Sequence, residues 1–593
     1  MDKSKLTGLI LISLIMVMYS YFEGQKQKAI SSSTENTITH ASPDTFIDDS
    51  VSQASTLHAV AGGVFATASA EMVEKLIVLE NEDIRVTLSS KGAQIQEVML
   101  KKYQDHLGNP FKILTKESSN MGFQFTSQKS IIHTSSLYFQ VVDNQAHPSG
   151  DQLQAVTFIL SVGKDQYIRQ TFTLPESGYG LTQSWEFVGS DGYMDQEPIQ
   201  FTWHNDLQRA EKDAVACRNK TTINYYLGNN NFENLKEHTD KKEECEVTSI
   251  MQWVAFKQRF FTTGIVPEQP FLEGKLCLYP TSKPDTVTKE ATVSLQLGAI
   301  KNAASGSFKF YFGPNTYKDL KGFAPGFSKN LSLGWPIIKW LNQYAVIPVF
   351  AFIENHVSNY GIIILLMVIL IKLALLPLSY RSYVSMAEIK LLKPTLDKLK
   401  ERYGSNMQQM QMEQVKLYKE MGINPLSGCI PVLLQMPVLL AMFNFFPNAI
   451  ELRQKSFLWA TDLSTYDSII NLSFHIPFYG SHVSLFTLLM TASTMLYTWY
   501  NNQMNPPQGP MKTMSYLFPV TFMFILNSFP AGLSFYYFVS NIITIAQQAI
   551  IKRFVDEDKI KEKLNQNRNN TFKKDKSFKQ RLQKAMQVNV AKK

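Results

Sequence analysis

Long apolar segments in two regions of the chain constrain its fold more than any other feature. One runs from Leu6 to Phe22, and the others follow after about Trp335, whereas the residues between them have the composition of a soluble protein. Segments of this length and composition are stable when they span a bilayer. The chain has 593 residues, which is too long for one hydrophobic core. The sequence therefore predicts a membrane protein with a separate extramembrane domain.

The N-terminal segment is interpreted as an uncleaved anchor followed by a tether. Lys3 and Lys5 precede the apolar run, and no small-x-small site follows it directly, which favours an anchor over a cleaved signal peptide. We assign residues 1–24 to this transmembrane anchor. Residues 25–70 are rich in Ser, Thr, Ala and Asp and lack apolar periodicity, so we expect a disordered tether.

Residues 71–320 alternate apolar and polar side chains with a period of two. Segments such as "AVTFILSV", "IQFTWHN" and "SFKFYFG" are rich in β-branched and aromatic residues, and Gly, Asn, Asp and Pro separate them. About a dozen such strands without a long helical window indicate one large antiparallel β-sandwich.

The region after residue 330 is predicted to be a polytopic helical membrane domain. Residues 330–356 contain two tryptophans and two prolines, which indicates an amphipathic helix in the membrane interface. A core at 357–551 follows, with a helical hairpin at 381–424 and spans at 357–380, 426–449, 483–500, 514–529 and 533–551. With the N-terminal anchor, the fold class is a six-span α-helical membrane protein carrying an all-β sandwich.

Charge sets the predicted orientation. The tail at 552–593 holds 14 Lys and Arg against 5 Asp and Glu, so it is expected in the cytoplasm. An even number of spans then places the N-terminus and the hairpin in the cytoplasm and the sandwich outside. There, Cys217 and Cys245 are candidates for a disulfide. With four cysteines in all and no C-x-x-C motif, no metal site is expected.

The hairpin is basic and contains several methionines, among them Met407, Met410 and Met412. Flexible thioether side chains adapt to varied apolar partners. The alternative is that these methionines only seal the two helices against each other.

Lys372 lies within the apolar run "GIIILLMVILIKLALLPL". A charge at the centre of a bilayer costs on the order of 3 kcal/mol, so it requires water or a partner. We find no Asp or Glu within the N-terminal apolar run from Leu6 to Phe22 or within the predicted spans that follow residue 424. They offer neutral polar residues instead: Gln435, Thr491, Ser493, Asn527, Ser540, Asn541 and Thr544. We favour a water-filled cavity lined by these groups over the alternative, a snorkelling lysine on a lipid-facing side.

Two other classes of function remain open at this point. A membrane transporter or channel with a lysine-lined cavity and a periplasmic sugar-binding domain fits the hydropathy, although no internal repeat is visible. An enzyme is the other, with His204 and Asp206 of "TWHNDL" as acid and base, but a His near an Asp on a strand end is more often structural.

Three segments resemble the YidC family of membrane protein insertases. They are "MGINPLSGCIPVLLQMPVLLAMFNFF" at 421–446, "ELRQKSFLWATDLS" at 451–464 and "FPAGLSFYYFVSNIITIAQQ" at 529–548. The long sandwich after the first span is similar to the Gram-negative bacterial branch of that family.

This resemblance implies a non-enzymatic insertase and chaperone that works alone or beside the Sec translocon, without cofactors. It implies a multi-pass protein of the bacterial inner membrane, with both termini cytoplasmic and the sandwich in the periplasm. The implied partners are nascent membrane proteins, the ribosome, the signal recognition particle and its receptor, the Sec translocon and the lipid bilayer. Lys372 matches the groove charge, where bacterial relatives usually have arginine. The implied substrate slide comprises Met436, Leu439, Leu440, Met523 and Phe524.

Overall fold

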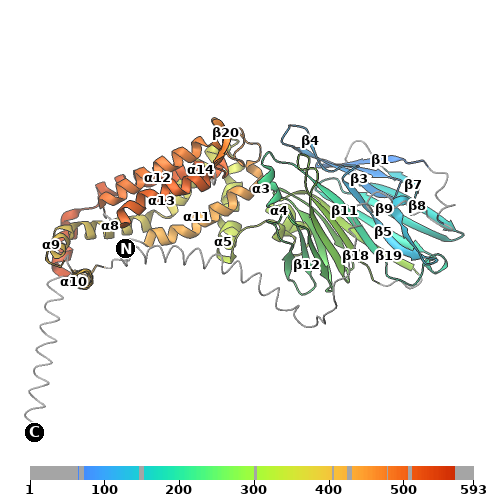
Figure 1. The fold of residues 1–593 in the computed structure, drawn as a ribbon, viewed down its shortest axis with the longest axis horizontal. Coiled ribbons are helices and arrows are strands. Elements are labelled where there is room, and N and C mark those ends of the chain that lie inside the picture. Colours follow the sequence, from blue (N-terminus) through green and yellow to red (C-terminus); the bar gives the residue numbers. More distant parts are fainter. Residues whose placement is uncertain are drawn as a thin grey trace, which may run out of the picture. The chain divides into compact units, whose positions relative to one another are not determined.

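The computed structural model describes residue 65 and residues 73–145, 153–298, 303–403, 406–423, 430–476, 479–504 and 510–567 (Figure 1). The predicted anchor, nearly all of the predicted tether and the tail beyond residue 567 lie outside these residues. A β-rich part is followed along the chain by a helical part.

The β-rich part contains three sheets whose paired strands are antiparallel. The nine-stranded sheet has the order β13 (Phe232–Asn234), β12 (Thr222–Leu227), β15 (Met251–Lys257), β16 (Phe261–Pro267), β19 (Ala303–Pro314), β10 (Gly180–Val188), β9 (Gln166–Leu174), β8 (Gln154–Gly163) and β7 (Gln140–Gln145). The six-stranded sheet has the order β14 (Glu243–Val247), β17 (Gly274–Pro280), β18 (Val287–Gln296), β11 (Gln200–Gln208), β5 (Ser119–Ser127) and β6 (Ser130–His133). The four-stranded sheet runs β1 (Leu76–Glu80), β2 (Ile84–Ser89), β3 (Gln94–Gln104) and β4 (Pro110–Leu114).

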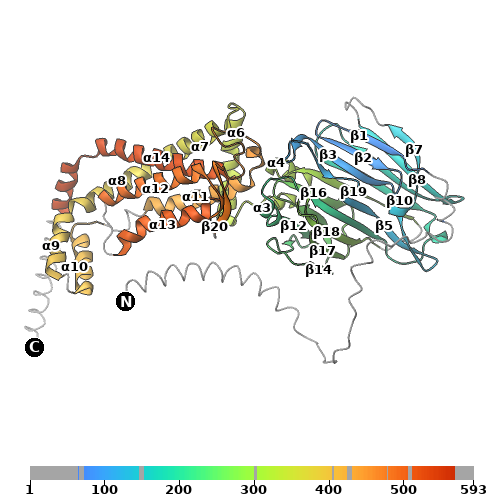
Figure 2. The ribbon, with the colours of Figure 1, turned by 45° about the horizontal axis from the view of Figure 1, so that its top comes forward.

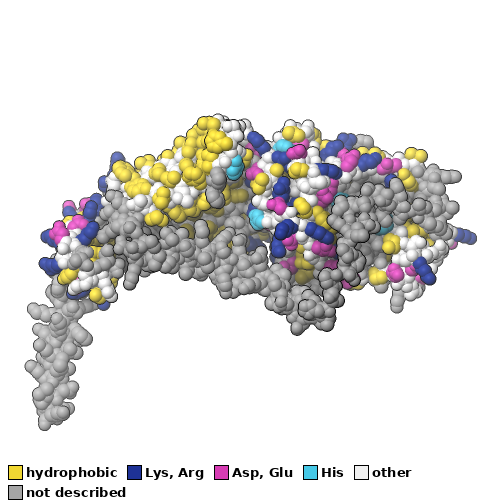
Figure 3. All heavy atoms as spheres, in the orientation of Figure 1, with side chains coloured by type: hydrophobic (Ala, Val, Ile, Leu, Met, Phe, Trp, Pro, Cys, Tyr) yellow, Lys and Arg dark blue, Asp and Glu magenta, His cyan; other side chains and the backbone are white. Residues whose placement is uncertain are grey.

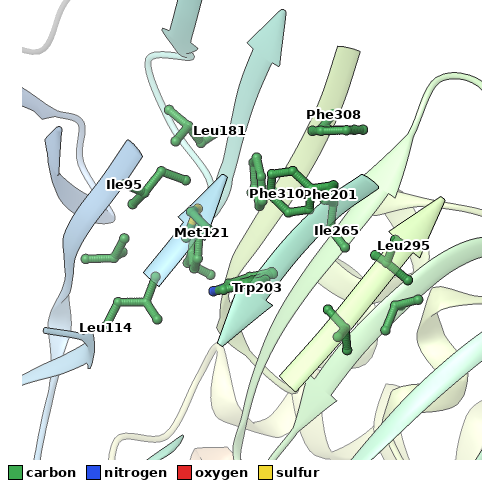
Figure 4. Packing of buried hydrophobic residues seen from close by; sticks show 14 of the residues in the cluster. Ile95, Leu114, Met121, Leu181, Phe201, Trp203, Ile265, Leu295, Phe308 and Phe310 are labelled. Atoms are coloured by element: carbon green, nitrogen blue, oxygen red, sulfur yellow. The ribbon is translucent and has the colours of Figure 1, made fainter. Parts of the chain in front are cut away.

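The three sheets share one apolar core, because the period-two pattern directs alternate side chains to the same side. In Figure 4, Ile95 comes from the four-stranded sheet, Trp203 from the six-stranded sheet and Phe310 from the nine-stranded sheet. The ring centroids of Trp203 and Phe310 are 5.6 Å apart. The predicted β-rich domain is therefore confirmed.

The predicted disulfide is not formed. Cys217 and Cys245 are free thiols in the structure, as is Cys277. Cys217 is buried in the short helix α3 (Ala214–Arg218), whereas Cys245 lies on β14 with its sulfur 3.8 Å from the Tyr225 hydroxyl. The two cysteines thus belong to different elements with different neighbours.

The helical part begins with α4 (Tyr317–Phe323), α5 (Pro336–Leu341), a π-helical turn (Asn342–Val346) and α6 (Ile347–Glu354). It continues with α7 (Tyr360–Ala374), α8 (Leu376–Leu391), α9 (Lys393–Tyr403), α10 (Met407–Glu420), α11 (Ile430–Asn448), α12 (Leu485–Met504), α13 (Pro510–Leu526) and α14 (Ala531–Phe554). A short hairpin, β20 (Ile470–Ile476) with β21 (Gly480–Val483), precedes α12. Both α7 and α12 pack against α14, and Figure 2 shows this group of helices.

By length and composition, one helical run of the described chain is suited to cross a membrane, Pro336–Glu354. α7 and α8, which meet at an angle of 61°, form a second candidate if the two helices are counted together as one span. α12 and α14 are 20 and 24 residues long, but polar residues lower their hydropathy, at the C-terminal end of α12 and along the length of α14. The six spans, and an interfacial position for residues 330–356, therefore stay predictions.

The predicted straight span at 357–380 is broken at Leu375. α7 ends at Ala374 and α8 begins at Leu376, with Pro377 in its first turn. Proline has no backbone N–H and its ring clashes with the preceding turn, which explains a break there. Lys372 consequently lies in the last turn of α7.

The predicted hairpin at 381–424 contains the C-terminal part of α8, then α9 and α10. α10 is capped by Asn406, whose side chain accepts a hydrogen bond from the Gln409 amide. The apolar seal in this region includes Leu417 and Tyr418 of α10 together with Ile560 and Leu564. The last two belong to a helical stretch at 557–567. Met412 is 62% exposed and Met410 is half-buried. The exposed Met412 does not take part in that seal.

Arg453, in the loop after α11, connects the helical part to the β-rich part. Its Nε lies 2.5 Å from Glu211 Oε1, and its Nη2 donates to the carbonyls of Gln104 at 2.6 Å and Ala210 at 3.1 Å. The next residue, Gln454, donates to the carbonyl of Asp105 at 2.8 Å. These contacts hold the segment between α11 and α12 against the β-rich part.

Candidate functional site

Lys372 is buried inside the helical part, with 6% of its surface exposed. Its carbonyl accepts a hydrogen bond from Nε2 of Gln547 on α14 at 3.4 Å. Ion pairs of the described helical part occur elsewhere, for example between Lys390 and Glu557 and between Lys563 and Glu388, and Lys372 belongs to none of them. The charge is thus inside the protein without a carboxylate partner among the described residues.

Three polar side chains join α12 to α14, the helix that also packs against α7. Nδ2 of Asn541 donates to Ser493 Oγ at 3.1 Å and to Thr494 Oγ1 at 2.8 Å. Both hydroxyls in turn donate to the carbonyl of Met490. We call Lys372, Ser493, Thr494, Asn541 and Gln547 the polar seam. Of the residues predicted from the sequence, Ser493 and Asn541 bond to each other across α12 and α14, and Lys372 is joined to α14 through its backbone carbonyl and Gln547.

Other predicted lining residues lie on the same two helices and bond within them. Thr491 donates to the carbonyl of Thr487 at 2.8 Å, and Thr544 donates to that of Ser540 at 2.6 Å. Ser540 is 7% exposed. A hydroxyl that donates to its own helix still has lone pairs free to accept from water or a substrate.

Asn527 belongs to a different cluster, at the N-terminal end of α12 next to the β20–β21 hairpin. It is fully buried, its Nδ2 donates to the carbonyls of Tyr479 and His482 at 2.8 Å each, and its Oδ1 accepts from the Ser484 amide at 3.0 Å. Ser484 Oγ donates to Asp467 at 2.5 Å and caps α12 by accepting from the Thr487 amide at 3.1 Å. This set, which we call the buried knot, comprises Asp467, His482, Ser484, Thr487 and Asn527.

Sequence reasoning missed four members of the buried knot, all but Asn527. Asp467 also accepts from Trp459 Nε1 at 2.8 Å and from the Phe486 amide at 3.0 Å, so its carboxylate is fully engaged. The available signal was a serine directly before an apolar helix, which is the pattern of an N-cap. Because its buried polar groups are hydrogen-bonded to one another, the knot holds together the start of α12, the end of α13 and the β20–β21 hairpin.

The predicted slide residues are partly exposed on two helices. Met436 and Leu440 of α11 are 47% and 39% exposed, and Leu439 and Gln435 are half-buried. On α13, Phe524 is 38% exposed and Met523 is half-buried. These apolar surfaces are available to a lipid chain or to another helix.

The alternative enzymatic pair is held by structural contacts. His204 Nδ1 lies 2.9 Å from Thr292 Oγ1 and its Nε2 lies 3.1 Å from Asp206 Oδ1. All three residues stand on the paired strands β11 and β18. In the part of the chain that the structure describes, no group of three or more His, Cys, Asp and Glu could hold a metal ion.

A β-rich domain joined to helices with an exposed apolar surface and an internal polar seam defines an integral membrane protein with an extramembrane domain. Figure 3 shows hydrophobic side chains gathered over the helices. Residues 76–346 match the family described as the YidC periplasmic domain, and residues 352–587 match that described as the 60Kd inner membrane protein.

Relatives agree with these matches over the full length. The membrane protein insertase YidC of Amoebophilus asiaticus is 60% identical, covering 100% of this chain and 99% of the relative. That of Cytophaga hutchinsonii is 42% identical over 95% of this chain and 92% of the relative. A crystal structure of an active YidC insertase with its first transmembrane domain resolved is 17% identical, with a TM-score of 0.32, and covers 81% of this chain and 92% of that one. The chain belongs to the YidC family of membrane protein insertases.

Proposed function

We propose that this protein inserts membrane proteins into the inner membrane and helps them fold, without catalysing a chemical reaction. The proposal rests on Lys372, a buried lysine with no carboxylate partner among the described residues, whose helix is joined through Gln547 to the helix that carries the hydrogen bonds of Asn541. Charges in such surroundings are stable when water reaches them. We infer a hydrophilic groove that opens toward the cytoplasm and to lipid, with Lys372 as its charge and the predicted polar residues as its lining.

The mechanism is thermodynamic. A groove that hydrates the inner half of the bilayer shortens the apolar barrier, so a polar tail of the substrate has only the outer leaflet to cross. The positive charge attracts an acidic tail into the groove. Burial of the substrate's new helix in lipid, at roughly 25 cal/mol per Å², then drives the transfer without a nucleotide.

In this proposal, helices α11 and α13, the α9–α10 hairpin and the basic tail bind the substrate or the targeting machinery. The substrate helix leaves along the slide formed by α11 and α13. The α9–α10 hairpin, with Met412 on its surface, and the basic tail contact the signal recognition particle, its receptor and the ribosome. The protein works alone or with the Sec translocon, has six spans, and keeps both termini in the cytoplasm.

Reconstituted vesicles test the role of the charge. The assay follows insertion of a small single-span protein with an acidic tail, measured by protease protection. Lys372→Arg keeps the positive charge and should support insertion, whereas Lys372→Ala should reduce it at least several-fold. The matched control is Lys339→Ala, which removes an exposed lysine from another apolar helical run, α5.

Equal insertion by Lys372→Ala and the control would contradict an essential groove charge. A substrate with a neutral tail should depend less on Lys372, since attraction is then absent. Solute flux through the same vesicles without a substrate protein would instead support a transporter or channel.

A further inference from the structure

The β20–β21 hairpin exposes an apolar face although it is a small element outside any core. Along β20, Ile470, Leu472, Phe474 and Ile476 alternate in sequence with Asn471, Ser473 and His475, and the pairing with β21 is irregular between Asn471 and Ile476. Ile470 and Phe474 are 54% and 61% exposed, and the preceding Ile469 is 43% exposed. A strand with this alternation normally buries its apolar face.

The pose of the hairpin is fixed by the buried knot. Asn527 binds the carbonyls of Tyr479 and His482, and the His482 ring stacks on Tyr466 with centroids 3.7 Å apart. Ile469 and Val483 are also joined by a backbone hydrogen bond. The apolar face is therefore held outward by the fold.

The exposed face continues the apolar surface of the helices. Tyr479 at the end of the hairpin packs on Phe524 of α13, with ring centroids 5.4 Å apart. Near Phe524, Ile525 is 50% exposed. In Figure 3, hydrophobic side chains cover much of the helical surface up to the end where Figure 1 places β20.

Composition and backbone restrict what can cover this face. Residues 468–484 contain no Lys, Arg, Asp or Glu, so nothing there offers an ion pair to a protein partner. A two-stranded hairpin leaves backbone groups unpaired at both edges, and these require water or lipid headgroups rather than hydrocarbon. An exposed aromatic side chain such as that of Phe474 suits the boundary between the two.

We propose that the β20–β21 hairpin is an anchor in the outer leaflet, with its apolar face resting at the boundary between headgroups and acyl chains. We choose the outer leaflet because Arg453 and Gln454, which lie with the hairpin in the segment between α11 and α12, bind the domain that matches the YidC periplasmic family. The anchor fixes the depth of the buried knot in the bilayer. This inference does not rest on the insertase activity.

Two neighbouring exposed positions of β20, one apolar and one polar, provide the test. Phe474→Cys and Ser473→Cys are made in the full-length protein, labelled with an environment-sensitive fluorophore and reconstituted into phosphatidylethanolamine and phosphatidylglycerol vesicles. Both side chains are exposed, so neither substitution disturbs packing. The unsubstituted protein, labelled in parallel, gives the background from its own cysteines.

The label at 474 should be quenched at least twofold more by lipids brominated near the headgroup than the label at 473, and aqueous iodide should show the reverse. Equal iodide quenching at both positions would overturn the proposal. So would stronger quenching at 474 by bromines near the bilayer centre. Protection of 474 that disappears at one protein per vesicle would assign the face to a second copy, which also overturns it.

Discussion

The ion pair between Arg453 and Glu211 supports a quantitative prediction about the connection of the two parts of the protein. The two side chains are only 2% and 4% exposed. The guanidinium also binds two carbonyls and lies over the ring of Phe261 at 5.2 Å. A buried pair that loses one partner leaves the other charge without compensation, which costs about 3–5 kcal/mol.

The two single substitutions should differ, because only one of the groups can become neutral. Glu211→Gln leaves a guanidinium that stays charged at any accessible pH, so the full cost of about 3–5 kcal/mol applies. Arg453→Met leaves a carboxyl whose pKa burial already raises, and this group can take up a proton. We expect Arg453→Met to be the milder change and the double substitution to recover most of the stability.

Thermal unfolding of the full-length protein in detergent micelles measures these differences, with limited proteolysis of the loop after α11 as a second readout. Glu97→Gln is the control, since the Glu97–Lys112 pair is 30% and 45% exposed and is worth at most about 1 kcal/mol. If Glu211→Gln behaves like this control, or if Arg453→Met proves the more damaging change, the reasoning is refuted.

Three further predictions concern separate parts of the chain. Burial lowers the pKa of Lys289 to about 8, so between pH 8 and 10.5 this lysine is protonated in the unfolded chain and neutral in the folded one. The free energy of unfolding should therefore rise by up to about 3 kcal/mol over this pH range, and urea unfolding of Lys289→Met should show no such rise. Gly361→Ala should destabilise α7 by at least about 1–3 kcal/mol in thermal unfolding, because the new Cβ would lie 2.1 Å from the Phe457 ring, whereas an equal change at the open Gly322 should not. Truncation after Asn567 removes nine Lys and Arg and one Asp, so ribosome binding in sedimentation should weaken more at low salt than at high salt; equal loss at both would contradict an electrostatic role.

Local patterns made much of the fold predictable. The period-two alternation predicted the β-rich domain because each strand carries its own signal, as in the burial pattern of β8. The helical hairpin was likewise visible as two polar helical windows. The break at Leu375 was missed although Pro377 marks it, since the apolar run around it suggested a continuous span.

Contacts between distant segments could not be read from the sequence. Arg453 and Glu211 are 242 positions apart, and the buried knot joins Asp467, Ser484 and Asn527 from a loop, a cap and a helix end. Lys372 could be singled out from the sequence because it is the one charged residue inside its long apolar run. The cysteines were misjudged, because spacing along the chain says nothing of the distance between two sulfur atoms.

The break at Leu375 has an electrostatic consequence for Lys372. Where a helix ends, its last carbonyl groups carry a partial negative charge of about half an electron, and a cation in the final turn is stabilised by roughly 0.3–2 kcal/mol. A continuous helix through residue 380 would have placed the lysine in mid-helix, without this contribution. The start of α8, one residue further on, carries the opposite partial charge, so the carbonyl groups of α7 contribute at Lys372 only to the extent that the 61° bend turns α8 away from their direction.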